Sequence, residues 1–285
     1  MKLSSEILGY LQGEAVRAAA KGGRYIHSQQ HEKIDVAHKS GMGSLATSVV
    51  TEVDYRSQEI ILHELRKSIE TYDLGLLTEE NSDNYSRLSK EYFWCIDPLD
   101  GTLSFTEGKA GYAVSIALVS QKGIPVLGII YDPIAKKIYC QSEDLNLQST
   151  EDQSLHCYLD RSFQKHPQKE LINAELQSFV TTTNLSGVHY HFGMGAVMNA
   201  LHVARHEYAV YFKFPKTTPG GGSMWDFAAT ACLYNSSGLS ATDIHGLPLK
   251  FADPETTFMH RRGVIFTRNE AIRDIIRSIN VLISV

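Results

Sequence analysis

Four short apolar runs, separated by turn residues, occupy residues 93–140 and constrain the fold more than any other feature. The runs are FWCI (93–96), YAVSIALV (112–119), PVLGIIY (125–131) and KKIYC (136–140). Lys122-Gly123 and Asp132-Pro133 are turn pairs that separate the last three runs. This pattern is typical of antiparallel strands that follow one another in a meander. We therefore expect a sheet in this part of the chain.

Strand-like and helix-like segments alternate along the rest of the chain. Helical spacing of apolar residues begins near Ile7, and a second helix is expected to begin at Asp54. Further helices are expected at 193–207, 226–234 with Gly238 as its C-cap, and 270–279 with Asn269 as its N-cap. Short apolar runs favour strands at 74–77, 178–184, 207–214 and 263–267. This mixture predicts an α/β (α+β) fold with layered packing.

Two polar stretches interrupt these patterns. Residues 39–48, KSGMGSLATS, are rich in glycine and serine, and we expect a mobile loop whose Gly-Met-Gly step hinges a flap. Residues 141–172 show no clear period, which suggests a boundary between two subdomains. The expected N-terminal α+β subdomain is 1–150, and the expected C-terminal α/β subdomain is 151–285.

Composition excludes several classes of protein. The chain has 285 residues and a net charge of -5, without the basic run that a nucleic-acid polymer would require. It contains no apolar stretch of about 18 residues, so neither a membrane span nor a signal peptide is expected. The four cysteines are far apart, with no CxxC pair. A cytoplasmic protein without disulfides is the expectation.

Carboxylates stand at the ends of several apolar runs. Glu79, Asp97, Asp100 and Asp226 have this position, and Asp54 is expected at a helix start. If the runs pack side by side, these charges meet, and like charges at close range need cations between them. Oxygen ligands select hard ions, of which Mg²⁺ is the commonest. The sequence therefore predicts a Mg²⁺ site in a cleft.

The segment WCIDPLDGT (94–102) provides two of these acids and the elements of an anion site. Pro98 restrains the backbone, and the Leu99 carbonyl offers a third oxygen ligand. Gly101 permits a close approach of the backbone to a ligand, and a helix starting near Thr102 would present free N–H groups to a phosphate. Metal ligands beside a phosphate site indicate phosphoryl chemistry by a metal-assisted attack of water.

Five motifs in one order resemble the inositol monophosphatase family of Mg²⁺-dependent, lithium-sensitive phosphomonoesterases. They are VTEVD (50–54), TEE (78–80), WCIDPLDGT (94–102), WDFAA (225–229) and SGL (237–239), and they cover most of the chain. The resemblance implies a layered αβαβα sandwich with the active site between two subdomains, two or three Mg²⁺ ions and a homodimer.

The resemblance also implies roles for individual residues. Glu79, Asp97 and the Leu99 carbonyl would hold one Mg²⁺, and Asp97, Asp100 and Asp226 a second, with Asp97 bridging the ions. Thr102 and Asp54, helped by Glu79, would position and activate the attacking water. Substrate phosphate would lie at the Gly101 and Thr102 N–H groups, next to the Leu99 carbonyl.

The chain departs from the family pattern at positions that bear on the substrate. Members specific for inositol carry a Glu shortly before the Trp-Asp pair, whereas this chain has no acid between Glu207 and Asp226 and has Lys213 and Lys216 instead. Thr78, Ser104 and Leu239 also differ from the pattern, but none of them is a metal ligand in it.

Several functions remain open at this point. The leading hypothesis is hydrolysis of a small polyol phosphate. The alternative is a 3'(2'),5'-bisphosphate nucleotidase acting on 3'-phosphoadenosine 5'-phosphate, with Lys213 and Lys216 on the second phosphate. A sugar bisphosphatase is a third possibility, and a non-catalytic metal-dependent binding protein is a fourth. The pairs His202/His206 and His189/His191 have ligand spacing, but zinc would need a third ligand that the sequence does not reveal.

Overall fold

The computed structural model describes residues 3–40, 43–141, 145 and 152–284, apart from the side chains of residues 31–51. The helices are α1 (Ser5–Ser40), α2 (Gly43–Tyr72), α3 (Ser86–Ser89), α4 (Thr102–Thr106), α5 (Lys169–Thr182), α6 (Ala196–Val203), α7 (Met224–Ser236) and α8 (Glu270–Ile283), with a 3₁₀ turn η1 (Arg161–Lys165). The strands are β1 (Gly75–Thr78), β2 (Tyr92–Asp100), β3 (Ala113–Ser120), β4 (Pro125–Asp132), β5 (Lys137–Cys140), β6 (Leu155–Leu159), β7 (Val188–Phe192), β8 (Ala209–Lys213), β9 (Ser240–Thr242) and β10 (Val264–Thr267).

The strands form two five-stranded sheets. The first has the order β1-β2-β3-β4-β5, in which β2 to β5 are the predicted antiparallel meander and β1 pairs with β2 in parallel. The second has the order β7-β6-β8-β10-β9, with β6 parallel to both β7 and β8. Strands β8, β10 and β9 pair antiparallel.

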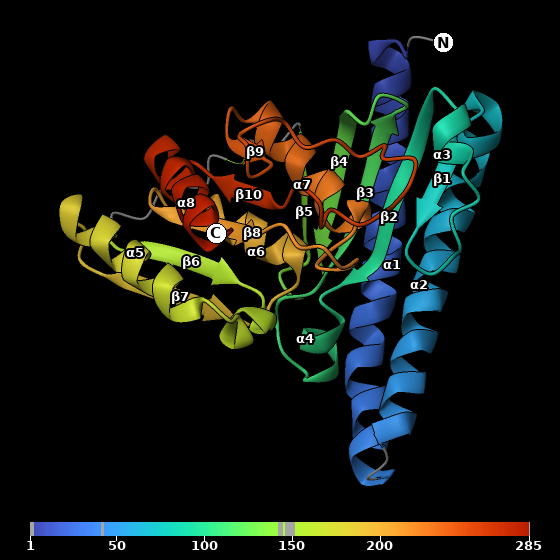
Figure 1. Ribbon diagram of the computed structural model, residues 1–285. Helices are drawn as coiled ribbons and strands as arrows, with labels where there is room; N and C mark the ends of the chain where they lie inside the picture. The colour runs from blue at the N-terminus through green and yellow to red at the C-terminus, as the bar shows by residue number, and fades with distance from the viewer. Residues whose placement is uncertain (1–2, 41–42, 142–144, 146–151, 285) are drawn as a thin grey trace.

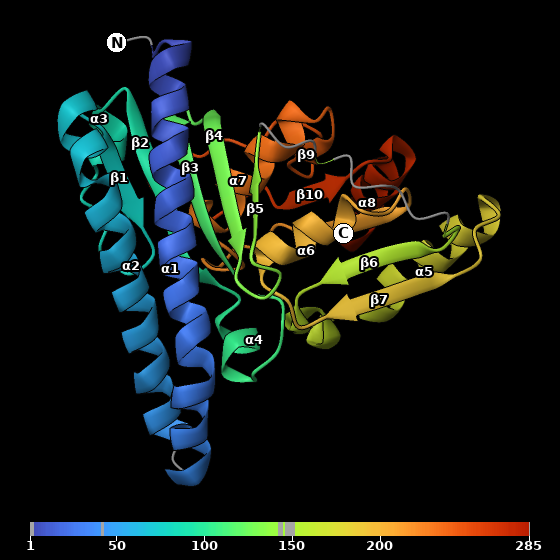
Figure 2. The ribbon, with the colours of Figure 1, turned by 180° about the vertical axis from the view of Figure 1, so that it is seen from behind.

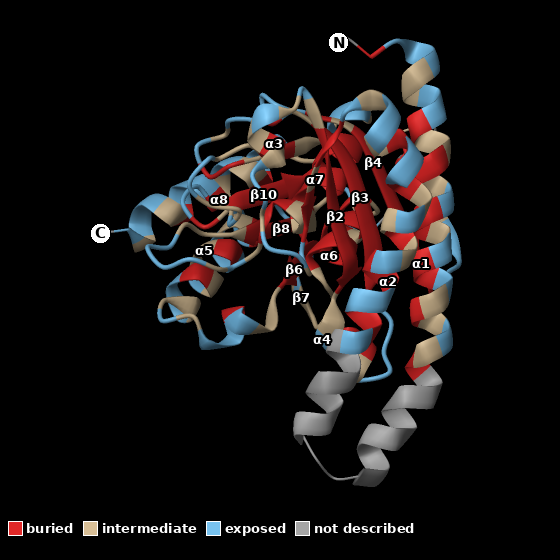
Figure 3. Cartoon of the chain, turned by 90° about the vertical axis from the view of Figure 1, so that its right-hand side faces the viewer, coloured by how far each residue is buried: buried red, intermediate tan, exposed pale blue. Residues whose placement is uncertain are grey.

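Helices and sheets alternate in five layers, and the αβαβα sandwich is confirmed (Figures 1 and 2). Helices α1 and α2 cover the outer face of the first sheet, α6 and α7 lie between the sheets, and α5 and α8 cover the second sheet. Three apolar clusters fill the spaces between these layers. Figure 3 shows the strands buried inside the helical layers. Within the described chain, no helix is long and apolar enough to cross a membrane.

The period-2 pattern of β2 decides which layer each side chain enters. Trp94 and Ile96 join the cluster beneath α1 and α2, whereas Phe93 and Cys95 join the cluster around α6 and α7. All four are fully buried, as expected for a strand covered on both faces. The next residue on the α7 side is Asp97, so the strand directs a carboxylate into the middle layer.

Three sequence predictions were wrong. Residues 178–184 lie largely in helix α5, because Ile172, Leu176 and Val180 form a buried stripe at helical spacing. The segment 141–172, expected to be irregular, contains strand β6 and the turn η1. In place of a loop at 39–48, α1 continues to Ser40 and α2 begins at Gly43, so Asp54 lies within α2 rather than at a helix start. Met42 of the expected flap hinge lies outside the described residues.

Other predictions were confirmed. Asn269 caps α8, because its side chain accepts hydrogen bonds from the N–H groups of Ala271 and Ile272 at 3.0 and 3.3 Å. Gly238 follows α7 with a φ of 70°, and the Leu239 N–H donates to the Tyr234 carbonyl at 2.9 Å, as in a Schellman motif. The strands β1 to β5 precede residue 150 and β6 to β10 follow it. The domain boundary itself stays a prediction.

Candidate active site

A β-bulge in β2 brings Asp97 and Asp100 to the same side of the sheet. Asp97 pairs with Ser115 of β3 and Asp100 with Ala113, so three steps on β2 oppose two on β3. In a regular strand, residues three apart point to opposite faces. The extra residue reverses this alternation, so that Leu99 enters the cluster beneath α1 and α2 and Asp100 turns toward the middle layer. The Asp-Pro-Leu-Asp segment is therefore a strand bulge, and Asp97 Oδ1 accepts the Leu99 N–H at 3.0 Å.

The first turn of α7 supplies the third acid. Ser223 and Asp226 form a capping box, in which Asp226 Oδ2 accepts the Ser223 N–H at 2.8 Å. Ser115 Oγ donates to the Trp225 carbonyl at 3.1 Å, which fixes this turn against β3. Asp226 was predicted as a metal ligand, and it is the third residue of α7, whereas Ser223 is the N-cap. The Asp226 side chain also lies within hydrogen-bonding range of Asp97.

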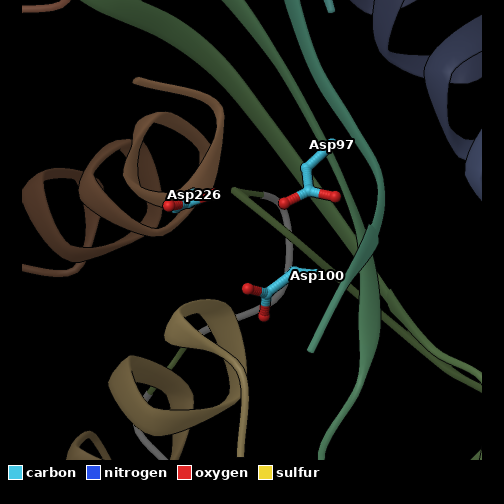
Figure 4. Close-up of side chains that lie close together, drawn as sticks. All are labelled: Asp97, Asp100 and Asp226. Atoms are coloured by element: carbon cyan, nitrogen blue, oxygen red, sulfur yellow. The ribbon is translucent and has the colours of Figure 1, made fainter. Parts of the chain in front are cut away.

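Asp97, Asp100 and Asp226 converge, although they are up to 129 residues apart in the chain. One carboxylate oxygen from each lies within 4.8 Å of the other two. Figure 4 shows the three side chains directed toward a common space between β2 and α7. Glu79, which follows β1, lies within hydrogen-bonding range of Asp97. The four acids predicted as ligands are thus brought together.

The electrostatics of this group fit a cation. Burial and the neighbouring carboxylates raise the pKa of Asp97 and Asp100 well above the ordinary value, and burial raises the pKa of Asp226. Burial and the charge of Asp226 raise the pKa of Glu79 to about 7. Without positive charge, these groups would hold protons that ordinary carboxyls release near pH 4. A hard divalent cation removes that penalty, and carboxylate oxygens are its preferred ligands.

Asp100 is further held by the middle-layer helix α6. Its Oδ1 and Oδ2 accept the N–H groups of Ala196 and Val197, each at 2.9 Å. Gly195 makes this approach possible, because a Cβ atom there would lie 2.2 Å from Asp100 Oδ2. Gly195 thus allows the start of α6 to pack directly on the Asp100 carboxylate.

Thr102 begins helix α4, as predicted, and Gly101 precedes it with a φ of 85°. Thr102 Oγ1 donates to the Leu99 carbonyl at 3.2 Å, which places both predicted site groups in one turn. The first-turn N–H groups of a helix have no partner within the helix. Gly101 was expected to allow a close approach of a ligand, which stays a prediction, and the structure shows a close approach of backbone at this glycine. A Cβ atom at Gly101 would lie 2.6 Å from the Gly111 carbonyl oxygen.

Asp54 is buried on α2, the helix that packs against β2. Burial and the charges of Glu80 and Glu79 raise the pKa of Asp54 to about 8. Its Oδ1 atom is buried without a hydrogen-bond partner among the described residues. One turn later on the same helix, Ser57 Oγ donates to the Pro98 carbonyl at 3.1 Å. The helix therefore places an unsatisfied carboxyl near the acids, although no hydrogen bond joins Asp54 to Thr102 in the described chain.

The two predicted substrate lysines differ in their surroundings. Lys213, the last residue of β8, pairs with Asp160 at 2.6 Å and is half-buried. Lys216 is exposed and lines a hollow with His260. Sequence reasoning missed Asp160, because the segment that contains it was taken as irregular. The alternation of LHCYL (155–159) before it was the available signal.

The histidines with ligand spacing lie on β7 (His189 and His191) and in or just after α6 (His202 and His206). His156 of β6 contacts His191 of β7 (Nδ1 to Nε2, 2.9 Å), and its ring stacks on His206 with centroids 4.0 Å apart. His156 Nε2 also lies 2.8 Å from Asp152 Oδ2. The rings stack and bond in pairs, and they do not converge on one point. Among the described residues, only the three aspartates form a compact group of metal-ligand atoms. Packing is therefore the better explanation of these histidines.

Comparisons with known proteins agree with this geometry. Residues 10–281 match the model of the inositol monophosphatase family. Inositol monophosphatase 1 of Solanum lycopersicum is 33% identical over 45% of this chain and 44% of its own length, so this match spans less than half of that relative. The 3'(2'),5'-bisphosphate nucleotidase CysQ of Salmonella typhimurium is 28% identical over 75% of this chain and 83% of its own length.

A solved structure gives the same result for the fold. CysQ from Bacteroides thetaiotaomicron superposes with a TM-score of 0.70 at 22% identity, over 90% of this chain and 97% of that one. The family match extends over nearly the whole chain and includes every acid of the site. This chain therefore belongs to the inositol monophosphatase family, whose members are phosphoric monoester hydrolases.

Proposed function

We propose that this protein is a Mg²⁺-dependent phosphomonoesterase that hydrolyses a small polyol phosphate of the inositol monophosphate type by in-line attack of water. The observation that supports it most is the convergence of Asp97, Asp100 and Asp226 beside the first turn of α4. Carboxylate ligands next to free helical N–H groups are suited to a phosphate ester and its counter-cations.

The acids divide into two ligand sets in this proposal. Glu79, Asp97 and the Leu99 carbonyl would hold one Mg²⁺, and Asp97, Asp100 and Asp226 would hold a second. When bound, Mg²⁺ would neutralise the phosphoryl oxygens and make water a stronger nucleophile at neutral pH. The hydrogen bonds from Ala196 and Val197 to Asp100 fix its carboxylate orientation before any ligand arrives.

The attacking water would be positioned and activated by Thr102, Asp54 and Glu79. Asp54 has a buried Oδ1 atom without a hydrogen-bond partner among the described residues, so its carboxylate could accept a proton from the attacking water, and Glu79 would assist from its place beside the metal. Thr102 Oγ1 already donates to the Leu99 carbonyl, so its oxygen can accept a hydrogen bond from water. The N–H groups of Gly101 and Thr102 would bind the phosphate oxygens.

A bisphosphate nucleotide is the second candidate substrate. Lys216 and His260 line one hollow, and this pair suits a second phosphate, whereas Arg261 in the same hollow is paired with Glu255 at 2.7 Å. Lys213 is less suited to that role, because Asp160 neutralises it. The same positively charged side chains would bind the second phosphate of a sugar bisphosphate.

A substrate panel tests the proposal. The purified protein with Mg²⁺ should hydrolyse inositol 1-phosphate with a higher kcat/KM than 3'-phosphoadenosine 5'-phosphate, and EDTA should stop both reactions. A preference for the nucleotide would favour the second candidate. No turnover of any ester, including p-nitrophenyl phosphate, would leave a non-catalytic metal-dependent binding protein as the better interpretation.

Three further features belong to the same proposal. Li⁺ should inhibit turnover if it competes at the second ligand set, and insensitivity to high Li⁺ would contradict that assignment. Light scattering during gel filtration should give the mass of a homodimer. Fractionation of the source cell should recover the protein in the cytoplasm.

A further inference from the structure

Arg87 is a charged residue of α3 that the fold buries almost completely, with 1% of its side chain exposed. Its Nε atom donates to Asp83 Oδ2 at 2.7 Å, and its Nη1 atom donates to the Asp253 carbonyl, also at 2.7 Å. Residues 87 and 253 are 166 positions apart in the chain. A buried guanidinium needs such partners, because they replace the water that it has lost. This side chain therefore joins two segments that are distant in the sequence.

On one side, Arg87 is fixed to the strand that leads to Glu79. The hydroxyl group of the preceding residue, Ser86, accepts the Leu76 N–H at 3.0 Å and donates to the Leu76 carbonyl at 3.3 Å. Helix α3 thereby packs on β1, and it also contacts β2 (Figure 1). Glu79 directly follows β1, and its N–H donates to the Ile96 carbonyl of β2 at 3.2 Å. The position of Arg87 is therefore tied to that of Glu79.

On the other side, the segment that begins at Asp253 holds the first turn of α7. The Asp253 side chain closes a turn by accepting the backbone N–H two residues later at 2.8 Å. Residues 257–259 then pair antiparallel with residues 222–224, through backbone hydrogen bonds of 2.8 and 3.0 Å. The second of these segments includes Ser223, the N-cap that shares a capping box with Asp226. The Asp253 carbonyl is therefore connected by a short, hydrogen-bonded path to Asp226.

Arg87 thus links the segment that leads to Glu79 with the segment that holds Asp226. These two acids belong to different ligand sets in the proposed function, and they lie within electrostatic range of each other. The guanidinium itself lies within electrostatic range of Cys95, two residues before Asp97 on β2. Because a guanidinium is planar, it fixes the direction of both of its hydrogen bonds, which makes the link rigid.

We propose that Arg87 is a positioning residue that sets the distance between the ligand set containing Glu79 and the ligand set containing Asp226. It acts through the two segments and is not itself a ligand in either set. When two ions act on one phosphate, their separation matters, so a displaced ligand set weakens the binding of one ion. This inference rests on the proposed phosphatase function and adds a residue that aligns its site.

Binding of Mn²⁺ to the protein without substrate tests the proposal. The wild type should bind two Mn²⁺ ions in titration calorimetry and give the EPR spectrum of a coupled pair. Arg87→Lys keeps the charge but loses the planar fork. It should weaken the second ion by about 10-fold, the lower end of the range for residues that orient metal ligands, and reduce the coupling. Asp83→Asn keeps an acceptor oxygen for Arg87 and should have a smaller effect in the same direction. It also decides the outcome should Arg87→Lys fail to fold.

Ile276→Val and Arg277→Lys are the matched controls. The first shortens a fully buried side chain in the core of the second sheet and lowers the Tm without changing the link. The second makes the same substitution at an exposed arginine of α8. Both should bind Mn²⁺ as the wild type does.

Unchanged Mn²⁺ affinity and coupling in Arg87→Lys and Asp83→Asn would overturn the inference. An equal loss in Ile276→Val would overturn it as well, because it would trace the effect to general stability. If the wild type binds fewer than two Mn²⁺ ions, the two ligand sets of the proposed function fail instead.

Discussion

The Asp100 carboxylate packs against Gly195 so closely that a Cβ atom on this glycine would lie 2.2 Å from Asp100 Oδ2. The contact joins the bulge of β2 to the start of α6, 95 residues later in the chain. It lets both Asp100 oxygens accept backbone N–H groups while the side chain still faces Asp97 and Asp226. The acid cluster can adopt this geometry because residue 195 has no side chain.

Gly195→Ala should lower the activity strongly, because the added Cβ atom would lie 2.2 Å from Asp100 Oδ2 and 2.7 Å from the Gly101 Cα atom. The added methyl group must displace Asp100, and a misplacement of about 1 Å at a reacting centre costs on the order of 100-fold in rate. Steady-state kinetics with p-nitrophenyl phosphate and Mg²⁺ titration would measure the loss. Gly187→Ala is the matched control, because nothing lies within 4 Å of a Cβ atom there. Comparable activity of the two variants would contradict the importance of this contact.

Asp97→Asn should have opposite effects on stability and on function. Burial and the neighbouring carboxylates disfavour the ionised form of Asp97, so a neutral replacement removes the free-energy cost of protonating this side chain when the metal-free protein folds. The Tm in EDTA should rise, by about 2–4 °C per kcal/mol of that cost. Turnover should be abolished, because a ligand shared by both sets is lost. Calorimetry in EDTA measures the Tm and a turnover assay with Mg²⁺ measures the activity, and a lower Tm in EDTA would contradict the predicted stabilisation.

The pH dependence of stability should depend on Mg²⁺. The pKa values of Asp54 and Glu79 in the folded state, about 8 and about 7, exceed the ordinary values near 4. At these two groups the metal-free folded state therefore binds more protons than the unfolded state, so their contribution to stability is full below pH 4 and is lost as the pH rises through 7 and 8. Mg²⁺ binds the ionised acids, so its stabilising effect should grow over the same range. Thermal melts at pH 5–8 with Mg²⁺ or EDTA measure this, and a shift independent of pH would contradict it.

His202 and His206 should limit stability on the acid side. Burial lowers the pKa of each to about 4, with help from neighbouring positive groups, including His191. Because the unfolded state binds more protons below the ordinary value near 6.5, the stabilising contribution is full above that pH and is lost as the pH falls through 4. His202→Gln should therefore flatten the fall in Tm between pH 6.5 and 4 at saturating Mg²⁺. The exposed His63→Gln is the control and should leave the slope unchanged.

The local pattern of the chain was sufficient for much of the fold. Alternation and turn pairs identified β2 to β5, and the order of acidic motifs identified Glu79, Asp97, Asp100 and Asp226 as a group. Prediction from the local pattern failed where one segment is compatible with both a strand and a helix. Residues 178–184 are rich in β-branched residues, yet they continue a helix whose buried stripe begins at Ile172, because packing on the sheet outweighs weak intrinsic propensity.

The sequence by itself determined which residues carry the chemistry, because residue type and spacing fix the available ligands and the strands that present them. Only the tertiary structure decided how Asp97 and Asp100 come to the same face, since a bulge depends on pairing with β3. The tertiary structure also placed Asp160, which directly follows β6, 2.6 Å from Lys213 at the end of β8. Parallel strands that are far apart in the sequence share one edge only after the sheet has formed. No local pattern could therefore reveal that Asp160 and Lys213 are neighbours.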